Sequence, residues 1–150
     1  SGRSAAPDFR KVRWGMSRKR VIELMEIEGG KPIHASQALV SYTEKLSGYP
    51  CTLNYVFKEG ALDGAVYRLR GIDSQVAKDA FEEMQEQLVW KYGEPSEDIS
   101  RRGGDRLSWE EGRTRVILVL LTREHANEVK LLYLHRAAVQ GMADGASGKF

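Results

Sequence analysis

The sequence has little of several features that would identify a function at once. One cysteine in 150 residues excludes an internal disulfide and any cysteine-based zinc cluster. No apolar run approaches the roughly 20 residues that a membrane helix needs, so we expect no transmembrane segment. The 23 basic and 21 acidic residues leave a net charge of +2, which argues neither for nor against a nucleic-acid partner. The fold must therefore rest on packing within one domain of ordinary size.

Catalytic motifs are also missing. The sequence contains no G-x-S-x-G, no P-loop and no G-x-G-x-x-G. His34, His125 and His135 do not stand at the spacings that favour a metal site on one helix or hairpin. Cys51 shares the parity of a predicted buried strand, which is typical of a small core residue rather than of a nucleophile. We therefore expect no catalytic residue, no cofactor and no metal, and we predict that the protein is not an enzyme.

Two amphipathic segments predict helices. In the first, Ser17 fits an N-cap and Gly29 a natural stop. The second is the segment DSQVAKDAFEEMQEQLVWKYGEP, which begins at Asp73 and ends at Gly93 and Pro95. Its apolar residues recur at helical spacing and predict a buried stripe made of Val76, Ala80, Phe81, Met84 and Leu88.

Elsewhere the apolar residues alternate with a period of two, which predicts antiparallel strands. Residues 51–58 and 65–70 form a hairpin, and ALVSYTEKL before them forms another strand. After the second helix, three further strands are predicted over DRLSWEEG, TRVILVLL and EVKLLYLHR. The pair Gly103 and Gly104 marks a turn that could carry one extra short strand on its N-terminal side.

The two halves of the chain correspond in order. Ser41 and Tyr42 match Ser108 and Trp109, and a helix precedes three strands in each half. We therefore predict an α+β fold built from a tandem repeat, in which a helix and an antiparallel three-stranded meander occur twice and both helices pack on one sheet face. The repeats would cover residues 9–70 and 71–136 of one combined globular domain. Residues 1–8 and 137–150 would be flexible tails.

Two short motifs carry a resemblance. WGMS opens the first helix and KYGEP closes the second. With the order of helix and meander, they resemble the bacterial cell-envelope domains of the β-lactamase-inhibitor-protein-like fold, relatives of the small lipoprotein of the outer-membrane β-barrel assembly machinery. The resemblance covers roughly residues 9–136 and implies a periplasmic or envelope-associated binding domain, with no catalytic residues to carry over. The chain has no lipobox cysteine, so membrane anchoring is not carried over, and a cytoplasmic location stays open.

The segment VILVLL, residues 116–121, is apolar on both strand faces, so we expect both faces to be covered by other apolar groups. If the odd-numbered residues share a face with the next strand, they form a patch at the limit of what soluble monomers expose. The candidate partner-binding residues are Ile117, Val119, Leu121, Leu132 and Leu134. Two coverings are compatible with the sequence. One is the protein itself, through a loop, sheet curvature or the C-terminal tail with Val139 and Met142, and the other is a protein partner or a symmetric dimer.

A basic segment supports a competing hypothesis. The stretch FRKVRWGMSRKR carries six candidate anion-binding residues, which are Arg10, Lys11, Arg13, Arg18, Lys19 and Arg20. They would either form a solvated face or bind an anionic surface, such as lipid headgroups, lipopolysaccharide or nucleic acid. The sequence thus predicts a non-enzymatic protein-binding or assembly module that uses an apolar sheet face, with binding to an anionic surface through residues 10–20 as the alternative and a small hydrolase as the least favoured class.

Overall fold

The computed structural model describes residues 7–123 and 126–136. Of the predicted tails, 1–8 and 137–150, residues 1–6 and the whole C-terminal tail with Val139 and Met142 lie outside the described residues, as does His125. The elements in chain order are α1 (Arg18–Ile27), β1 (His34–Ala35), β2 (Leu39–Leu46), β3 (Tyr49–Lys58), β4 (Ala61–Arg70), α2 (Ser74–Tyr92), β5 (Glu97–Arg101), β6 (Gly104–Glu111), β7 (Thr114–Arg123) and β8 (Ala126–His135). No helix among the described residues is both long and apolar enough to cross a membrane.

The described strands form one antiparallel sheet in the order β1-β2-β3-β4-β8-β7-β6-β5. The α+β class and the antiparallel sheet are confirmed, but the predicted tandem repeat of a helix and a three-stranded meander is wrong. β1 is an additional strand at one edge, and β5 at the other edge is the short extra strand that the turn at Gly103 and Gly104 allows. β4 pairs directly with β8, so the eight strands are continuous. β1 has two exposed residues and β5 has one half-buried residue, Ile99. Such strands carry too little alternation to be counted from periodicity.

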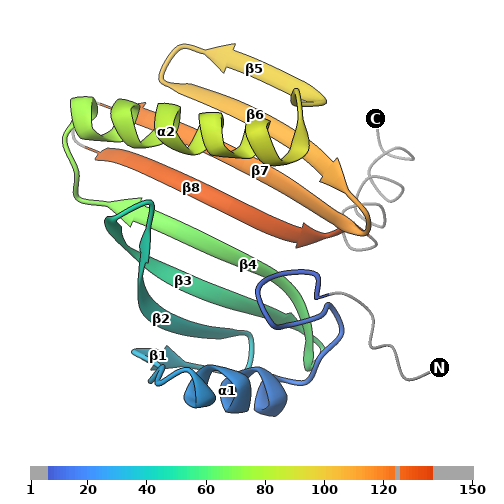
Figure 1. Ribbon diagram of the computed structural model, residues 1–150. Helices are drawn as coiled ribbons and strands as arrows, with labels where there is room; N and C mark the ends of the chain where they lie inside the picture. Colours follow the sequence, from blue (N-terminus) through green and yellow to red (C-terminus); the bar gives the residue numbers. More distant parts are fainter. Residues whose placement is uncertain (1–6, 124–125, 137–150) are drawn as a thin grey trace.

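Both helices lie on the same face of the sheet. Figure 1 shows α2 lying along β7 and β8, with α1 at the opposite end of the sheet near β1 and β2. The Tyr55 hydroxyl of β3 donates to Met25 Sδ of α1 at 3.3 Å. Trp109 Nε1 of β6 donates to the carbonyl of Gly93, the C-cap of α2, at 2.8 Å. The side chains between these two anchors form the core.

Local sequence signals explain where the helices begin and end. The Ser17 side chain accepts a hydrogen bond from the Arg20 backbone N–H and caps α1. The Asp73 side chain accepts one from the Val76 backbone N–H and caps α2. The buried residues of α2 are Ala77, Ala80, Phe81, Met84 and Leu88. The predicted stripe is thus confirmed at four positions, while Val76, in the first turn, is only half-buried.

The core fills the helix-covered face from β2 to β6. Its members on β3, β4, β7 and β8 include Leu53, Tyr55, Ala65, Leu69, Val116, Leu118, Leu120, Val129 and Leu131. The even-numbered residues of VILVLL therefore face the helices. Between the two helices the N-terminal segment closes the core, because Phe9 packs on the rings of Tyr55, Tyr67 and Tyr133 with centroids 4.8–6.0 Å apart.

Candidate functional site

The second face of the sheet carries no described helix. Its side chains can be traced by register, because directly paired residues of neighbouring strands point to the same side. One row crosses the sheet through Asn54, Val66, Leu132, Ile117 and Ser108. We call this surface the open face.

The five predicted partner-binding residues all lie on the open face. Ile117 is paired with Leu132, and Leu134 is paired with Arg115, which has the same parity as Ile117, Val119 and Leu121. Val119, Leu121, Leu132 and Leu134 are half-buried. Ile117 is only 6% exposed, although no helix of the described residues covers it.

The apolar surface extends into the first half of the sheet. Val66 of β4 is paired with Leu132, and Val56 of β3 lies beside Gly64, which is paired with Leu134. Both valines are half-buried. We define the central patch as the residues Val56, Val66, Ile117, Val119, Leu121, Leu132 and Leu134. The two valines are not among the residues predicted from the sequence, although their shared parity with Asn54 and Arg68 places them on this face.

Charged side chains surround the central patch. Arg68 Nε donates to Glu128 Oε1 at 2.7 Å, and Arg70 lies 3.6 Å from the same carboxylate. On the other side of the patch Arg115, 17% exposed, forms an ion pair of 2.9 Å with Glu97. These ion pairs hold the arginine side chains at the border of the patch. Because the arginines outnumber the carboxylates, the rim of the patch is basic.

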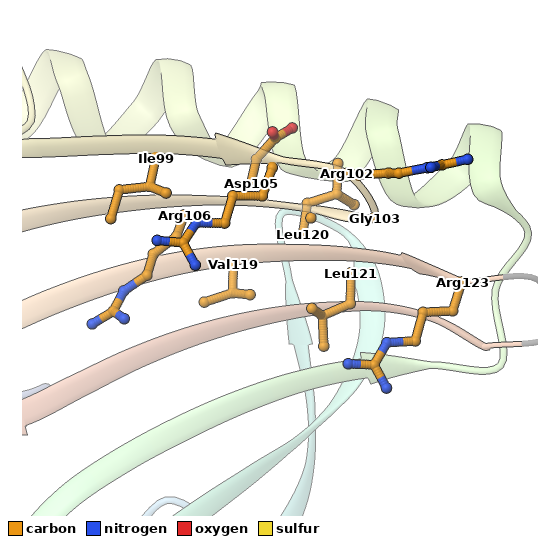
Figure 2. Close-up of a pocket in the computed structure, with 11 residues that line it drawn as sticks. Ile99, Arg102, Gly103, Asp105, Arg106, Val119, Leu120, Leu121 and Arg123 are labelled. Atoms are coloured by element: carbon orange, nitrogen blue, oxygen red, sulfur yellow. The ribbon is translucent and has the colours of Figure 1, made fainter.

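The arginines at one end of the open face differ from those beside the central patch, because they have no described ion-pair partner. A hollow of about 430 Å³ lies over β5, β6 and β7 (Figure 2). Its open-face lining consists of Ile99, Arg101, Gly104, Arg106, Val119, Leu121 and Arg123. We call it the arginine hollow. Arg102, in the turn between β5 and β6, also borders the hollow, and none of the four arginines forms an ion pair with a residue that the structure describes.

The basic segment of residues 10–20 is arranged differently. Arg10 binds Glu44 at 3.0 Å and Glu28 at 3.1 Å, and Lys11 lies 3.2 Å from Glu28. Arg20 pairs with Glu23, and Arg18 donates to the Ser36 carbonyl. Arg13 and Lys19 are exposed. Four of the six predicted anion-binding residues are thus engaged with groups of the chain itself, and the role of the segment stays a prediction.

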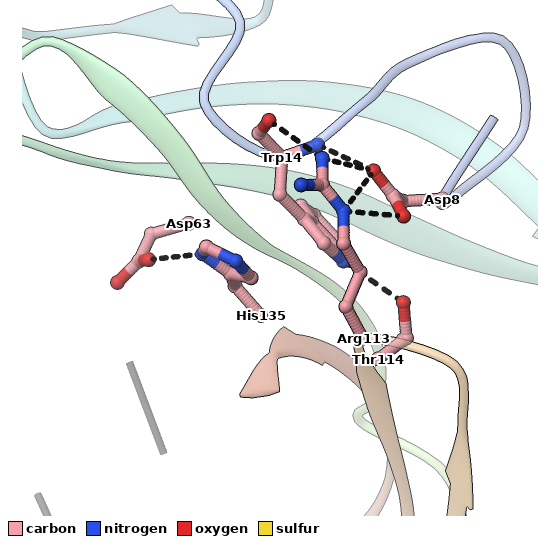
Figure 3. Close-up of polar contacts among 6 residues, drawn as sticks. All are labelled: Asp8, Trp14, Asp63, Arg113, Thr114 and His135. Carbon is pink, nitrogen blue, oxygen red and sulfur yellow. Dashed lines mark hydrogen bonds and ion pairs between the residues drawn. The ribbon is translucent and has the colours of Figure 1, made fainter. Parts of the chain in front are cut away.

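A polar cluster anchors the N-terminal segment to the second half of the chain (Figure 3). Arg113 donates to both oxygens of Asp8 at 2.8–3.1 Å, and the Trp14 backbone N–H donates to Asp8 Oδ2 at 2.9 Å. Trp14 Nε1 donates to Thr114 Oγ1 at 2.8 Å, and the Trp14 ring stacks on His135. Because these groups satisfy one another, the cluster is a structural tie between distant parts of the chain.

The described residues lack a cluster of potential metal ligands, and their single cysteine is buried. No group of three or more His, Cys, Asp and Glu side chains within residues 7–123 and 126–136 is arranged to hold a metal ion. Burial raises the pKa of the Cys51 thiol to about 11, so the reactive thiolate is scarce at neutral pH.

No protein-family model matches the chain, and no curated protein or solved structure matches it either. The resemblance to cell-envelope domains therefore stays a prediction from the sequence. The function has to be inferred from the chemistry of the open face.

Proposed function

We propose that the protein is a non-enzymatic binding module whose open face docks a protein partner. The observation that supports this is the central patch, where seven apolar side chains from four strands adjoin one another on the face without a described helix. Contiguous apolar surfaces rimmed by polar residues mark interaction sites on soluble proteins. A role in the bacterial cell envelope is the setting that the sequence resemblance suggests.

The rim indicates the chemistry of the partner. Arg68, Arg70 and Lys130 lie beside the patch, and Arg68 and Arg70 share the single carboxylate of Glu128. An apolar partner surface bordered by acidic side chains would complement this arrangement, because opposite charges at the rim guide association and exclude wrong partners. Binding should then weaken moderately, but not disappear, as the salt concentration rises.

The test is to place a lysine in the patch. Leu132→Lys and Val119→Lys point to the open face and should leave the helix-covered core intact, so both variants should keep a melting temperature close to that of the parent. Ile27→Lys is the matched control, because Ile27 is 74% exposed at the end of α1 on the other side of the sheet. Partners captured by the parent and by Ile27→Lys, but not by the patch variants, would support docking through the open face.

Two results would overturn the proposal. If Leu132→Lys and Val119→Lys unfold or aggregate, the patch is internal core rather than a binding surface. If the folded variants capture the same proteins as the parent, the partner binds elsewhere. Sedimentation velocity of the parent and of Leu132→Lys identifies the remaining outcome, in which the occupant is a second copy and the variant alone is monomeric.

A further inference from the structure

The arginine hollow has an ordered pattern of charged and apolar side chains. By register, Arg106 lies between Ile99 and Val119, and Gly104 lies between Arg101 and Leu121. Apolar and cationic residues therefore alternate across the three strands. Figure 2 shows the side chains of Ile99, Arg106, Val119, Leu121 and Arg123 on the side of the sheet away from α2.

Gly104 keeps the floor of the hollow open. A Cβ atom at this position would lie 3.0 Å from the Leu120 carbonyl oxygen and 3.4 Å from Leu121 Cδ2. Any larger residue would press on the backbone of β7 and fill the space between Arg101 and Leu121. The absence of a side chain there leaves room for a group from outside.

The charge of the hollow is not balanced by the described part of the chain. Arg68 and Arg115, elsewhere on the open face, each have a glutamate partner. Arg101, Arg106 and Arg123 are exposed and have no described carboxylate partner. Asp105 also borders the hollow, but it is paired with Leu120 and points toward α2, away from Arg106 (Figure 2). A carboxylate supplied from outside would form charge-assisted hydrogen bonds with these guanidinium groups.

The spacing of the arginines defines the ligand further. Arg106 is paired with Val119, and Arg123 lies four residues further along β7 on the same face. At about 3.3 Å per residue this separates the two arginines by roughly 13 Å along the strand direction. An extended peptide presents every second side chain to one side, so its residues i and i+4 have the same separation. Residue i+2 would lie over Leu121 and the space above Gly104.

From this geometry we infer that the arginine hollow binds an extended acidic segment of a protein partner, with Asp or Glu at positions i and i+4 and an apolar residue at i+2. This inference rests on the proposed function, because it names the chemistry of one part of the partner. A lipid fits less well, since its acyl chain would have to cross guanidinium groups that alternate with the apolar residues. A free phosphate would gain nothing from Ile99, Val119 and Leu121.

The experiment is an NMR titration of the ¹⁵N-labelled protein with the capped peptide Thr-Glu-Thr-Leu-Thr-Glu-Thr. We expect concentration-dependent shifts of the backbone amides of residues 99–106 and 119–123. The peptide with glutamine in place of both glutamates should bind at least tenfold more weakly. Arg106→Gln and Arg123→Gln should each weaken binding of the acidic peptide at least threefold. Lys19→Gln, which removes an exposed charge from α1, should leave it unchanged.

Several outcomes would overturn the inference. Equal binding of the glutamine peptide, or unchanged binding by Arg106→Gln, would show that the arginines do not recognise the carboxylates. Stronger shifts of the same amides with phosphatidylglycerol vesicles or with inorganic phosphate would assign the hollow to a lipid or to a small anion. Leu132→Lys lies outside the hollow and separates the two proposals. If it abolishes partner capture while the peptide fails to bind, only this inference falls, and if the peptide binds while capture is unaffected, only the proposed function falls.

Discussion

Removing the charge of Asp8 should weaken the tie between the N-terminal segment and the β6–β7 turn. The Asp8 side chain is 11% exposed, and it accepts hydrogen bonds from Arg113 and from the Trp14 backbone. Asp8→Asn keeps an oxygen that can accept from Trp14 but loses the ion pair. Because Arg113 is 53% exposed, solvent screens the pair, and we expect a loss of about 1–2 kcal/mol of unfolding free energy. In a chain of this size that corresponds to a fall in Tm of roughly 3–6 °C.

The same contact predicts a pH dependence. Burial raises the pKa of the Asp8 carboxyl, but the hydrogen bonds from Arg113 and Trp14 lower it more, so the pKa lies below its ordinary value. A carboxyl whose pKa is lower in the folded state contributes stability that is present above the unfolded-state pKa. This contribution is lost as the pH falls through the folded-state pKa. The parent should therefore lose its advantage over Asp8→Asn as the pH falls below about 4.

Urea denaturation at several pH values measures both effects. The fluorescence of Trp14 and Trp109 reports unfolding, because both rings are buried in the folded protein. Glu111→Gln, an exposed position on β6 beside the same turn, is the matched control. A double-mutant cycle with Arg113→Gln should give a coupling of about 1 kcal/mol. The reasoning fails if Asp8→Asn is no less stable than Glu111→Gln at pH 7, or if its deficit is the same at pH 3 and pH 7.

Three further predictions concern the core and the helix caps. Met84→Asp should unfold the domain, because it forces an unpaired charge against the sheet at a cost of several kcal/mol, and a soluble variant with an unchanged melting temperature would show that the buried face of α2 is misplaced. Ser17→Ala should cost about 1 kcal/mol in urea denaturation, since it removes the acceptor for the Arg20 N–H, and a change below a few tenths would show that the cap is dispensable. The Cys51 thiol, buried and with its pKa raised to about 11, should react with Ellman's reagent at pH 8 only on the timescale of unfolding, and immediate labelling of the folded protein would contradict its placement.

The features that the sequence predicts well are local ones. Ser17 and Gly93 are found because a cap is a relation between residues three or four positions apart. The extra strand before Gly103 is confirmed as β5, since a two-residue turn fixes its partner. The expected placement of Ile117 on one face with Leu132 agrees with the register of β7 and β8.

The features that the sequence does not reveal depend on pairing between distant segments. The predicted helix-plus-three-strand repeat is wrong, because β4 pairs with β8 and merges the strands into one sheet. The sequence of either strand alone does not predict this pairing. Arg101 and Arg106 of the arginine hollow stand close together in the sequence, but Arg123 joins them only through the pairing of β6 with β7. The basic stretch of residues 10–20 has carboxylate partners at Glu28 and Glu44. These partners lie outside the stretch, so its composition does not predict them.

The pairing of β4 with β8 also has a consequence for the order in which the chain folds. Neighbouring strands within each half are joined by short connections, and hairpins of this kind form within about 1–10 μs. Arg70 meets Glu128 only after a loop that contains α2 and three strands has closed, and closing long loops slows folding. We therefore expect the two halves to gain structure early and the seam between β4 and β8 to form late. Because Val66 and Leu132 pair across that seam, the central patch forms only when folding is complete. A partner that docks there would therefore bind the fully folded protein and not partly folded intermediates.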